Sequence, residues 1–247
     1  MRCGLCHQVV DKLLKSHIVP EAMMLHGRPN DCDKAMLILP SDDGKHAKRS
    51  PTGIYSPIVC AQCEASFQRG DDELLRLLRT LAEGAPVASE NGRALAKEYP
   101  HIDSSVLHRG ILTTLFRAHL SPHEAFNRVD LGPYAEAIRQ LVSGQGPTIG
   151  AGFDVVLRVI EGQVGAITHS PFRERWNSVN AYRLYFPNIT AYVKVDRRQF
   201  GELFDSVRLR PNVAPLAIIK ETLSPSELRL LGTLVAKHEQ ALERVAK

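Results

Sequence analysis

Two Cys-x-x-Cys pairs constrain the fold of this 247-residue chain more than any other feature. The pairs are Cys3 with Cys6 and Cys60 with Cys63, and the fifth cysteine, Cys32, lies between them. Inside cells, such pairs are metal ligands more often than disulfides. A redox-active pair is the alternative, but no βαβ pattern surrounds either one. We therefore predict that the four paired cysteines hold one structural Zn²⁺ and that Cys32 is a bystander in a turn.

The composition is that of an ordinary globular protein. Hydrophobic residues make up 44% and charged residues 23%, which is enough apolar material to build a core. No apolar run approaches the roughly 20 residues of a membrane span, and "MRCGLC" is not a signal peptide. We therefore expect a cytoplasmic protein with no membrane partner. The net charge of +4 permits a nucleic-acid partner without requiring one.

The pattern of apolar residues predicts an N-terminal module and a larger second unit. Strands are expected at "LLKSHIVP", "AMLILP" and "GIYSPIVC", and a helix is expected to begin near Cys63. "SSVLHRGILTTLFRAHLS" predicts a helix capped by Asp103 or Ser104, and a second helix at "LGPYAEAIRQLVSGQG" should stop at Gly144. Four strands then follow, with "FPNI" as a hairpin turn between two of them. Ser224 opens a capping box, which predicts a long C-terminal helix.

These elements define an α+β fold with two units. Residues 1–83 form a zinc-bound ββα module, residues 84–103 are a linker or cover segment, and residues 104–247 form an α+β domain. The larger domain is expected to hold an antiparallel sheet and the C-terminal helix. We assign it target recognition or oligomerisation, through a homodimer or a partner protein.

The order of the first three elements resembles the zinc-containing HNH nucleases, also called His-Me finger nucleases, which carry a treble-clef zinc site. "SHIVP" is similar to their "[DE]H-I-x-P" segment, and "IVCAQCE" is similar to the "LCxxCN" or "LCxxCH" start of their helix. This resemblance covers about residues 1–70. Most of the chain also resembles bacterial proteins that carry "SHIIP" and "LCxxCE", a similarity that implies no activity.

The resemblance implies roles for individual residues. His17 matches the general base that deprotonates water, a task that suits a neutral imidazole. Glu64 follows the last zinc cysteine, where the family has Asn or His binding the catalytic metal, and a carboxylate suits Mg²⁺ or Mn²⁺. Ser16 replaces the usual Asp, His or Glu and would be a weaker ligand of that ion. Tyr55 and Ser56 fall where a positioning Asn is common.

Each of these roles has an alternative. His17 is either the base or a buried histidine that donates to a backbone carbonyl in a module that has lost catalysis. Asp71 lies on the face of Glu64 if one helix runs through Gly70, and would then be a further acid at the site. The interpretation we favour is that Asp71 and the acids after it cap a second helix that begins beyond Gly70.

Two basic regions are candidate contacts for nucleic acid. The loop "GKHAKRSP" offers Lys45, Lys48 and Arg49 to phosphates. Residues 171–198 combine basic and aromatic side chains, for which we favour an antiparallel sheet with one packed face over a binding surface. The sequence thus predicts a zinc-stabilised HNH-like endonuclease that hydrolyses DNA, or RNA, with Mg²⁺ or Mn²⁺, in a bacterial antiviral defence setting. The alternative function is a non-catalytic zinc module that binds nucleic acid or a protein.

Overall fold

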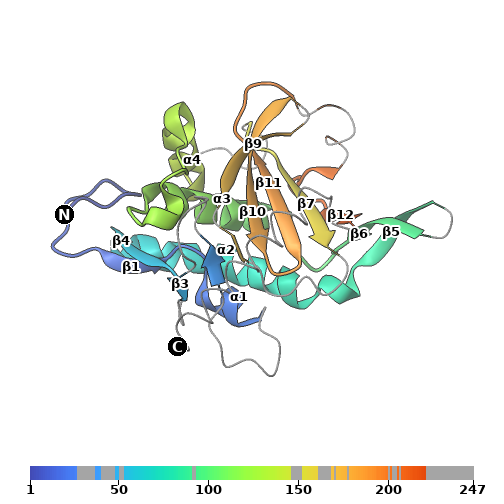
Figure 1. The fold of residues 1–247 in the computed structure, drawn as a ribbon, viewed down its shortest axis with the longest axis horizontal. Helices are drawn as coiled ribbons and strands as arrows, with labels where there is room; N and C mark the ends of the chain where they lie inside the picture. The colour runs from blue at the N-terminus through green and yellow to red at the C-terminus, as the bar shows by residue number, and fades with distance from the viewer. Residues whose placement is uncertain are drawn as a thin grey trace, which may run out of the picture.

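The computed structural model describes most of the chain up to residue 220. The described residues are 1–26, 37–39, 48–49, 53–90, 93–145, 152–160, 168–169, 171–176, 178–199, 201, 205 and 207–220. Within them the fold is α+β, with four α-helices, a seven-stranded mixed sheet and a cysteine cluster near the N-terminus (Figure 1). Cys32, Lys45 and the predicted C-terminal helix lie outside the described residues.

The N-terminal module has the predicted strand–strand–helix order. Strand β1 (Leu14–His17) pairs antiparallel with β4 (Tyr55–Val59), and helix α2 (Ala61–Arg79) follows at once. An acid in the first turn of α2 and arginines in its last turn complement the helix dipole. Shorter elements complete this part of the chain: α1 (Glu21–His26), β2 (Leu37–Leu39) and β3 (Lys48–Arg49), of which β2 and β3 form a three-stranded sheet with β8 (Thr168–His169).

Helix α2 runs through Gly70 without a break, so the predicted second helix beyond Gly70 is wrong. The reason is tertiary, because Gly70 lies against Gly110 of helix α3 (Ser104–Leu120). A Cβ atom built on Gly110 would stand only 2.4 Å from the carbonyl oxygen of Gly70. The two glycines let the helices cross in close contact, and Asp71 therefore continues α2 instead of capping a new helix.

The next two helices begin and end close to where the sequence predicts. Asp103 caps α3, accepting hydrogen bonds from the amides of Ser105 at 2.9 Å and Val106 at 3.1 Å. The helix ends at Leu120, two residues before Pro122. Helix α4 (Ala135–Val142) ends shortly before Gly144, whose positive φ of 76° suits a glycine at a helix end.

The seven-stranded sheet is mixed, so the predicted purely antiparallel sheet is wrong. After β11 the chain crosses to the other side of β7, and β12 therefore pairs with β7 in parallel while the other neighbours pair antiparallel. The turn between β10 and β11 is the predicted "FPNI" hairpin, with Asn188 at φ 57°. The strands, in spatial order, are β5 (Ala85–Glu90), β6 (Arg93–Glu98), β12 (Leu216–Lys220), β7 (Val155–Ile160), β11 (Ile189–Lys194), β10 (Val179–Phe186) and β9 (Phe172–Trp176).

Residues 84–103 do more than link or cover. They contribute the hairpin β5–β6, which joins the large sheet through the pairing of β6 with β12 (Figure 1). The domain boundaries at residues 83 and 104 stay a prediction. One cluster of buried apolar side chains includes residues of α2, of α3 and of the sheet, so α3 packs between the cysteine-bearing module and the sheet. In the described part of the chain, no helix is both long and apolar enough to span a membrane.

Candidate functional site

The four paired cysteines come together in space. Their Sγ atoms all lie within 4.8 Å of one another, and the sulfurs of Cys6 and Cys60 are 3.9 Å apart. All four are free thiols, because a disulfide would need its sulfurs about 2.05 Å apart. Four thiolates at about 2.3 Å from one zinc ion would be separated by about 3.8 Å, close to the observed spacing. The cluster could therefore hold one Zn²⁺ after a small contraction.

The cluster is held from several sides. The turn between Cys3 and Cys6 is fixed to the end of β4, because the amide of Gly4 donates to the carbonyl of Ile58 at 2.9 Å. Arg139 of α4 donates to the carbonyl of Leu5 at 2.7 Å. Cys60 occupies the N-cap position of α2, and its amide donates to Sγ of Cys3 at 3.3 Å. These contacts come from three elements, so the positions of the ligands depend on tertiary packing.

The environment of the thiols favours thiolate at Cys3. Burial acts to raise the pKa of Cys3, but hydrogen bonds from the backbone at Cys6, Cys60 and Leu5 outweigh it and lower the pKa to about 6. Burial and the neighbouring sulfurs raise the pKa of Cys63 above its ordinary value. Four negative sulfurs so close together repel one another, so all four ionise together only with a cation between them.

Ser16 and His17 occupy the end of β1, where the resemblance requires them. Ser16 is fully buried, and its Oγ has no hydrogen-bond partner among the described residues. His17 is half-buried, and its ring meets that of Tyr55 edge to face, with the centroids 5.8 Å apart. Because successive residues of a strand point to opposite faces, Ser16 faces the interior and His17 the outer face. His17 is therefore nearer to solvent than Ser16.

Glu64 lies in the first turn of α2, which packs against β1. Its Oε2 is buried, and this oxygen also has no hydrogen-bond partner in the described part of the chain. A buried polar atom without a partner costs about 1–3 kcal/mol, so native structures rarely keep one without a compensating ligand or water. Both predicted ligands of the catalytic ion, Ser16 and Glu64, thus present an unsatisfied buried oxygen.

A buried ion pair lies two turns further along α2. Arg117 of α3 binds Asp71 with two hydrogen bonds, at 3.0 Å from Nη1 and 2.5 Å from Nη2. The Arg117 side chain is only 1% exposed, and its Cζ lies 5.3 Å from the centroid of the Phe67 ring. Our sequence analysis did not identify this pair. The available signal was an arginine inside the otherwise apolar run "ILTTLFRAHL".

Serine side chains connect β1 and β4 to the end of α3. Ser16 and Ser56 are paired across the two strands, which places both side chains on one face. The hydroxyl of Ser56 is 2.7 Å from that of Ser121, which lies one helical turn beyond Arg117. Ser56, predicted at a positioning role, is thus engaged with α3, whereas Tyr55 is exposed on the outer face.

The predicted phosphate contacts are only partly described. Lys48 and Arg49 form β3, which pairs with β2, so this part of the basic loop is a short strand. In residues 171–198, strands β9 to β11 are antiparallel, as predicted for the packed alternative. Arg183 in β10 pairs with Glu174 and lies over the Tyr192 ring, 5.1 Å from its centroid, so its guanidinium is occupied within the sheet.

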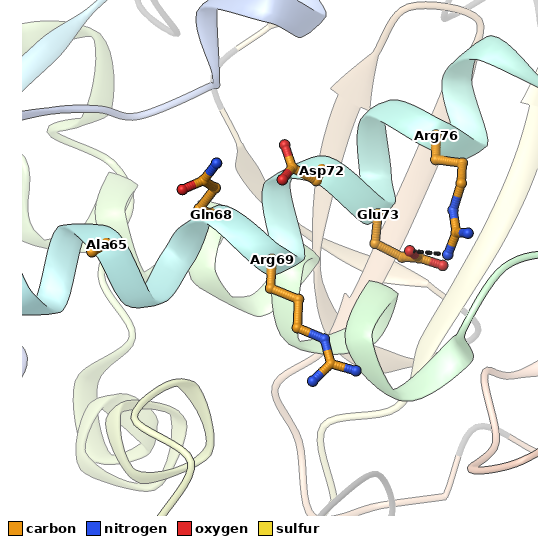
Figure 2. Close-up of a pocket in the computed structure, with 6 residues that line it drawn as sticks. All are labelled: Ala65, Gln68, Arg69, Asp72, Glu73 and Arg76. Atoms are coloured by element: carbon orange, nitrogen blue, oxygen red, sulfur yellow. Dashed lines mark hydrogen bonds and ion pairs between the residues drawn. The ribbon is translucent and has the colours of Figure 1, made fainter.

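The outer face of α2 carries a shallow depression that is separate from these groups. Figure 2 shows its lining and the contact between Glu73 and Arg76. Glu73 also accepts a hydrogen bond from the amide of Asp103, which links α2 to the start of α3. This depression contains no predicted site residue. Its lining residues are Ala65, Gln68, Arg69, Asp72, Glu73 and Arg76.

Comparisons with protein-family models, with curated proteins and with solved structures found no match to this chain. The geometry therefore stands on its own. It supports an α+β protein with a four-cysteine cluster that could hold one zinc ion.

Proposed function

We propose that the chain is a zinc-stabilised endonuclease of the HNH type, which hydrolyses DNA phosphodiesters with the help of a divalent metal ion. The observation that carries the proposal is the pair of unsatisfied buried oxygens, Oγ of Ser16 and Oε2 of Glu64. They belong to the two residues that the resemblance assigns to the catalytic ion. The order β1, β4 and α2, with cysteines at its beginning and end, supports a treble-clef zinc site.

The residues present suit a hard cation. A carboxylate and a hydroxyl are oxygen ligands of the kind that Mg²⁺ and Mn²⁺ prefer, with water and substrate phosphate completing the shell. In the described part of the chain, no arginine or lysine compensates Oε2 of Glu64, an engagement that would favour a non-catalytic module. When bound, the ion would supply charge stabilisation at the scissile phosphate.

His17 is the residue that we assign to proton transfer. Its half-buried position at the end of β1 allows a water molecule to reach the imidazole, and the edge of the Tyr55 ring restricts its orientation. A neutral imidazole can take a proton from water at neutral pH. Lys45, Lys48 and Arg49, from the sequence between β2 and β4, are proposed to contact the phosphates of the nucleic acid.

Cleavage assays with matched variants test this proposal. The zinc-loaded protein is incubated with supercoiled plasmid, single-stranded DNA and RNA, each with and without added Mn²⁺ or Mg²⁺. His17→Ala should lower the cleavage rate by roughly two to four orders of magnitude, as expected for loss of a general base. Glu64→Gln should also lower it, with partial recovery at high Mn²⁺, because glutamine keeps an oxygen ligand. The control variants, His101→Ala and Glu83→Gln, alter exposed residues and should leave the rate unchanged.

Zinc content separates a catalytic role from a structural one. Elemental analysis should show equal zinc in the wild-type protein and in His17→Ala. If His17→Ala loses zinc, the histidine is a structural ligand and its proposed role is wrong. If the wild-type protein cleaves none of the substrates with either metal, the nuclease proposal is wrong. Binding to labelled DNA or RNA under those conditions would then favour the non-catalytic module.

A further inference from the structure

We infer that the pair Asp71–Arg117 balances charge beside the proposed divalent-ion site, so that Glu64 keeps the one uncompensated negative charge to which the cation binds. This inference rests on the proposed function, because it assigns two further residues to the same site. It makes α3, which lies outside the segment similar to HNH nucleases, part of that site. Asp71 and Arg117 are positioning residues in this scheme, since they act through Glu64.

The first step is the placement of the two carboxylates. Asp71 follows Glu64 by seven residues, which is two helical turns and a rise of about 10 Å, on the same face of α2. Phe67 lies between them on that face, and its ring contacts the Arg117 guanidinium. Burial raises the pKa of Asp71, the Arg117 charge opposes this rise, and the charge on Glu64 adds to it. The two carboxylates are therefore close enough to feel each other.

The second step is the charge balance. Glu64 and Asp71 contribute two negative charges, and Arg117 contributes one positive charge through its two hydrogen bonds to Asp71. The difference is one negative charge, located on the carboxylate with an unsatisfied buried oxygen. An isolated buried carboxylate is unstable unless it is protonated or meets a cation. A site with this balance favours a divalent cation that also binds the phosphate of a substrate.

The third step is the convergence of three elements on one region. Three side-chain atoms of the described residues are buried and unsatisfied here: Oγ of Ser16 in β1, Oε2 of Glu64 in α2 and Nε of Arg117 in α3. Ser16 shares a strand face with Ser56, and Ser56 contacts Ser121, one turn beyond Arg117. Arg117 thus holds a spare donor near an acceptor that lacks one. Its hydrogen bonds to Asp71 keep its charge directed away from Glu64.

A purely structural role is the competing explanation, in which the pair only holds α2 against α3. The two explanations differ in the sign of their effects on cation affinity. If the pair is structural, each substitution lowers stability, and the double variant is no better than the single ones. If the pair balances charge, removal of Asp71 alone is harmful because it releases Arg117 toward Glu64, and the additional removal of Arg117 restores the balance.

The test measures Mn²⁺ binding to the zinc-loaded full chain by calorimetry and by electron paramagnetic resonance. Asp71→Asn should weaken binding about tenfold or more, because a full charge next to a buried site outweighs solvent screening. The double variant Asp71→Asn/Arg117→Gln should return to within about threefold of the wild-type affinity, a coupling that only interacting residues show. Arg117→Gln alone should bind Mn²⁺ more tightly than the wild type. Asp72→Asn, a neighbouring exposed acid, is the control and should change the affinity less than about threefold.

The outcomes separate the inference from the function on which it rests. Circular dichroism and zinc content establish that each variant is folded. If the wild-type protein binds Mn²⁺ and Glu64→Gln does not, but the double variant is as weak as Asp71→Asn, the charge-balance inference is wrong and the proposed site stands. If the wild-type protein binds no Mn²⁺, or Glu64→Gln binds it equally well, both are wrong. The inference stands if affinity falls in Asp71→Asn and recovers in the double variant.

Discussion

The close crossing of α2 and α3 gives a prediction whose sign depends on geometry. Gly110→Ala places a methyl group 2.4 Å from the carbonyl oxygen and 2.8 Å from the carbonyl carbon of Gly70. Ordinary contacts of a Cβ atom lie at 3.4–4 Å, so the helices must separate by about 1 Å. The atoms in the way are backbone, and no rotation of a side chain relieves the contact.

Two opposite free-energy terms decide the result. Alanine is a better helix former than glycine by about 1 kcal/mol, which would stabilise an isolated α3. Overpacking of a tight interface costs about 1–3 kcal/mol, and here it also disturbs the buried pair of Asp71, next to Gly70, with Arg117. We expect the second term to dominate, with a net loss of about 1–2 kcal/mol. For a chain of this length, that loss lowers the unfolding midpoint by about 2–8 °C.

Thermal and urea unfolding of three variants test this reasoning. Gly70→Ala should be destabilised less than Gly110→Ala, because its methyl group would meet Gly110 at the longer distance of 2.7 Å. Arg109→Ala, an exposed substitution on the same helix, should change the free energy of unfolding by less than about 0.5 kcal/mol. If Gly110→Ala unfolds at or above the wild-type midpoint, the helices do not cross as closely as the structure indicates, and the reasoning is refuted.

Two further predictions concern the zinc cluster and the sheet. Cys60→Ser should lose zinc and most of a binding free energy on the order of 10 kcal/mol, whereas Cys32→Ser should keep one zinc per chain; elemental analysis of wild-type protein without zinc would contradict this. Asp154→Asn should cost about 3–5 kcal/mol in urea unfolding at pH 7, because it removes the buried partner of Lys194 at 2.6 Å. Although burial opposes it, Lys194 and Arg208 lower the pKa of Asp154 below its ordinary 3.8, so its stabilisation is present above that pH and is lost as the pH falls further. The deficit of the Asn variant should therefore shrink below about pH 3.8, and a deficit that stays constant in acid would contradict the ion pair.

Local chemistry made several elements predictable. The Asp103 cap, the end of α3 before Pro122 and the turn at Asn188 each depend on a few neighbouring residues whose backbone preferences are strong. The pairing of Cys3 and Cys6 with Cys60 and Cys63 was predictable for a different reason. Four thiols in two short pairs have few stable arrangements inside a cell other than around one metal ion. The positions of Ser16, His17 and Glu64 on β1 and α2 followed from the order of these elements.

Contacts between distant segments were beyond the sequence. Gly70 has the local signature of a helix break, and only the approach of Gly110 from α3 explains why α2 continues. Residues 84–103 are polar enough to suggest a linker, yet they form strands because β12, more than a hundred residues later, offers an edge for pairing. The parallel pairing of β12 with β7 likewise depends on the path of the chain after β11. Local propensity contains no information about which edge a strand will meet.

The candidate site divides in the same way. The sequence by itself determined the zinc ligands and the residue types at the end of β1 and the start of α2, because these are set by spacing along the chain and by ligand chemistry. Only the tertiary structure decided that Oγ of Ser16 and Oε2 of Glu64 are buried without partners. It also decided that Asp71 pairs with Arg117, 46 residues away. Burial and ion pairing depend on which helices pack together, and that packing is settled by the shape of whole faces, such as the two glycines that let α2 and α3 approach.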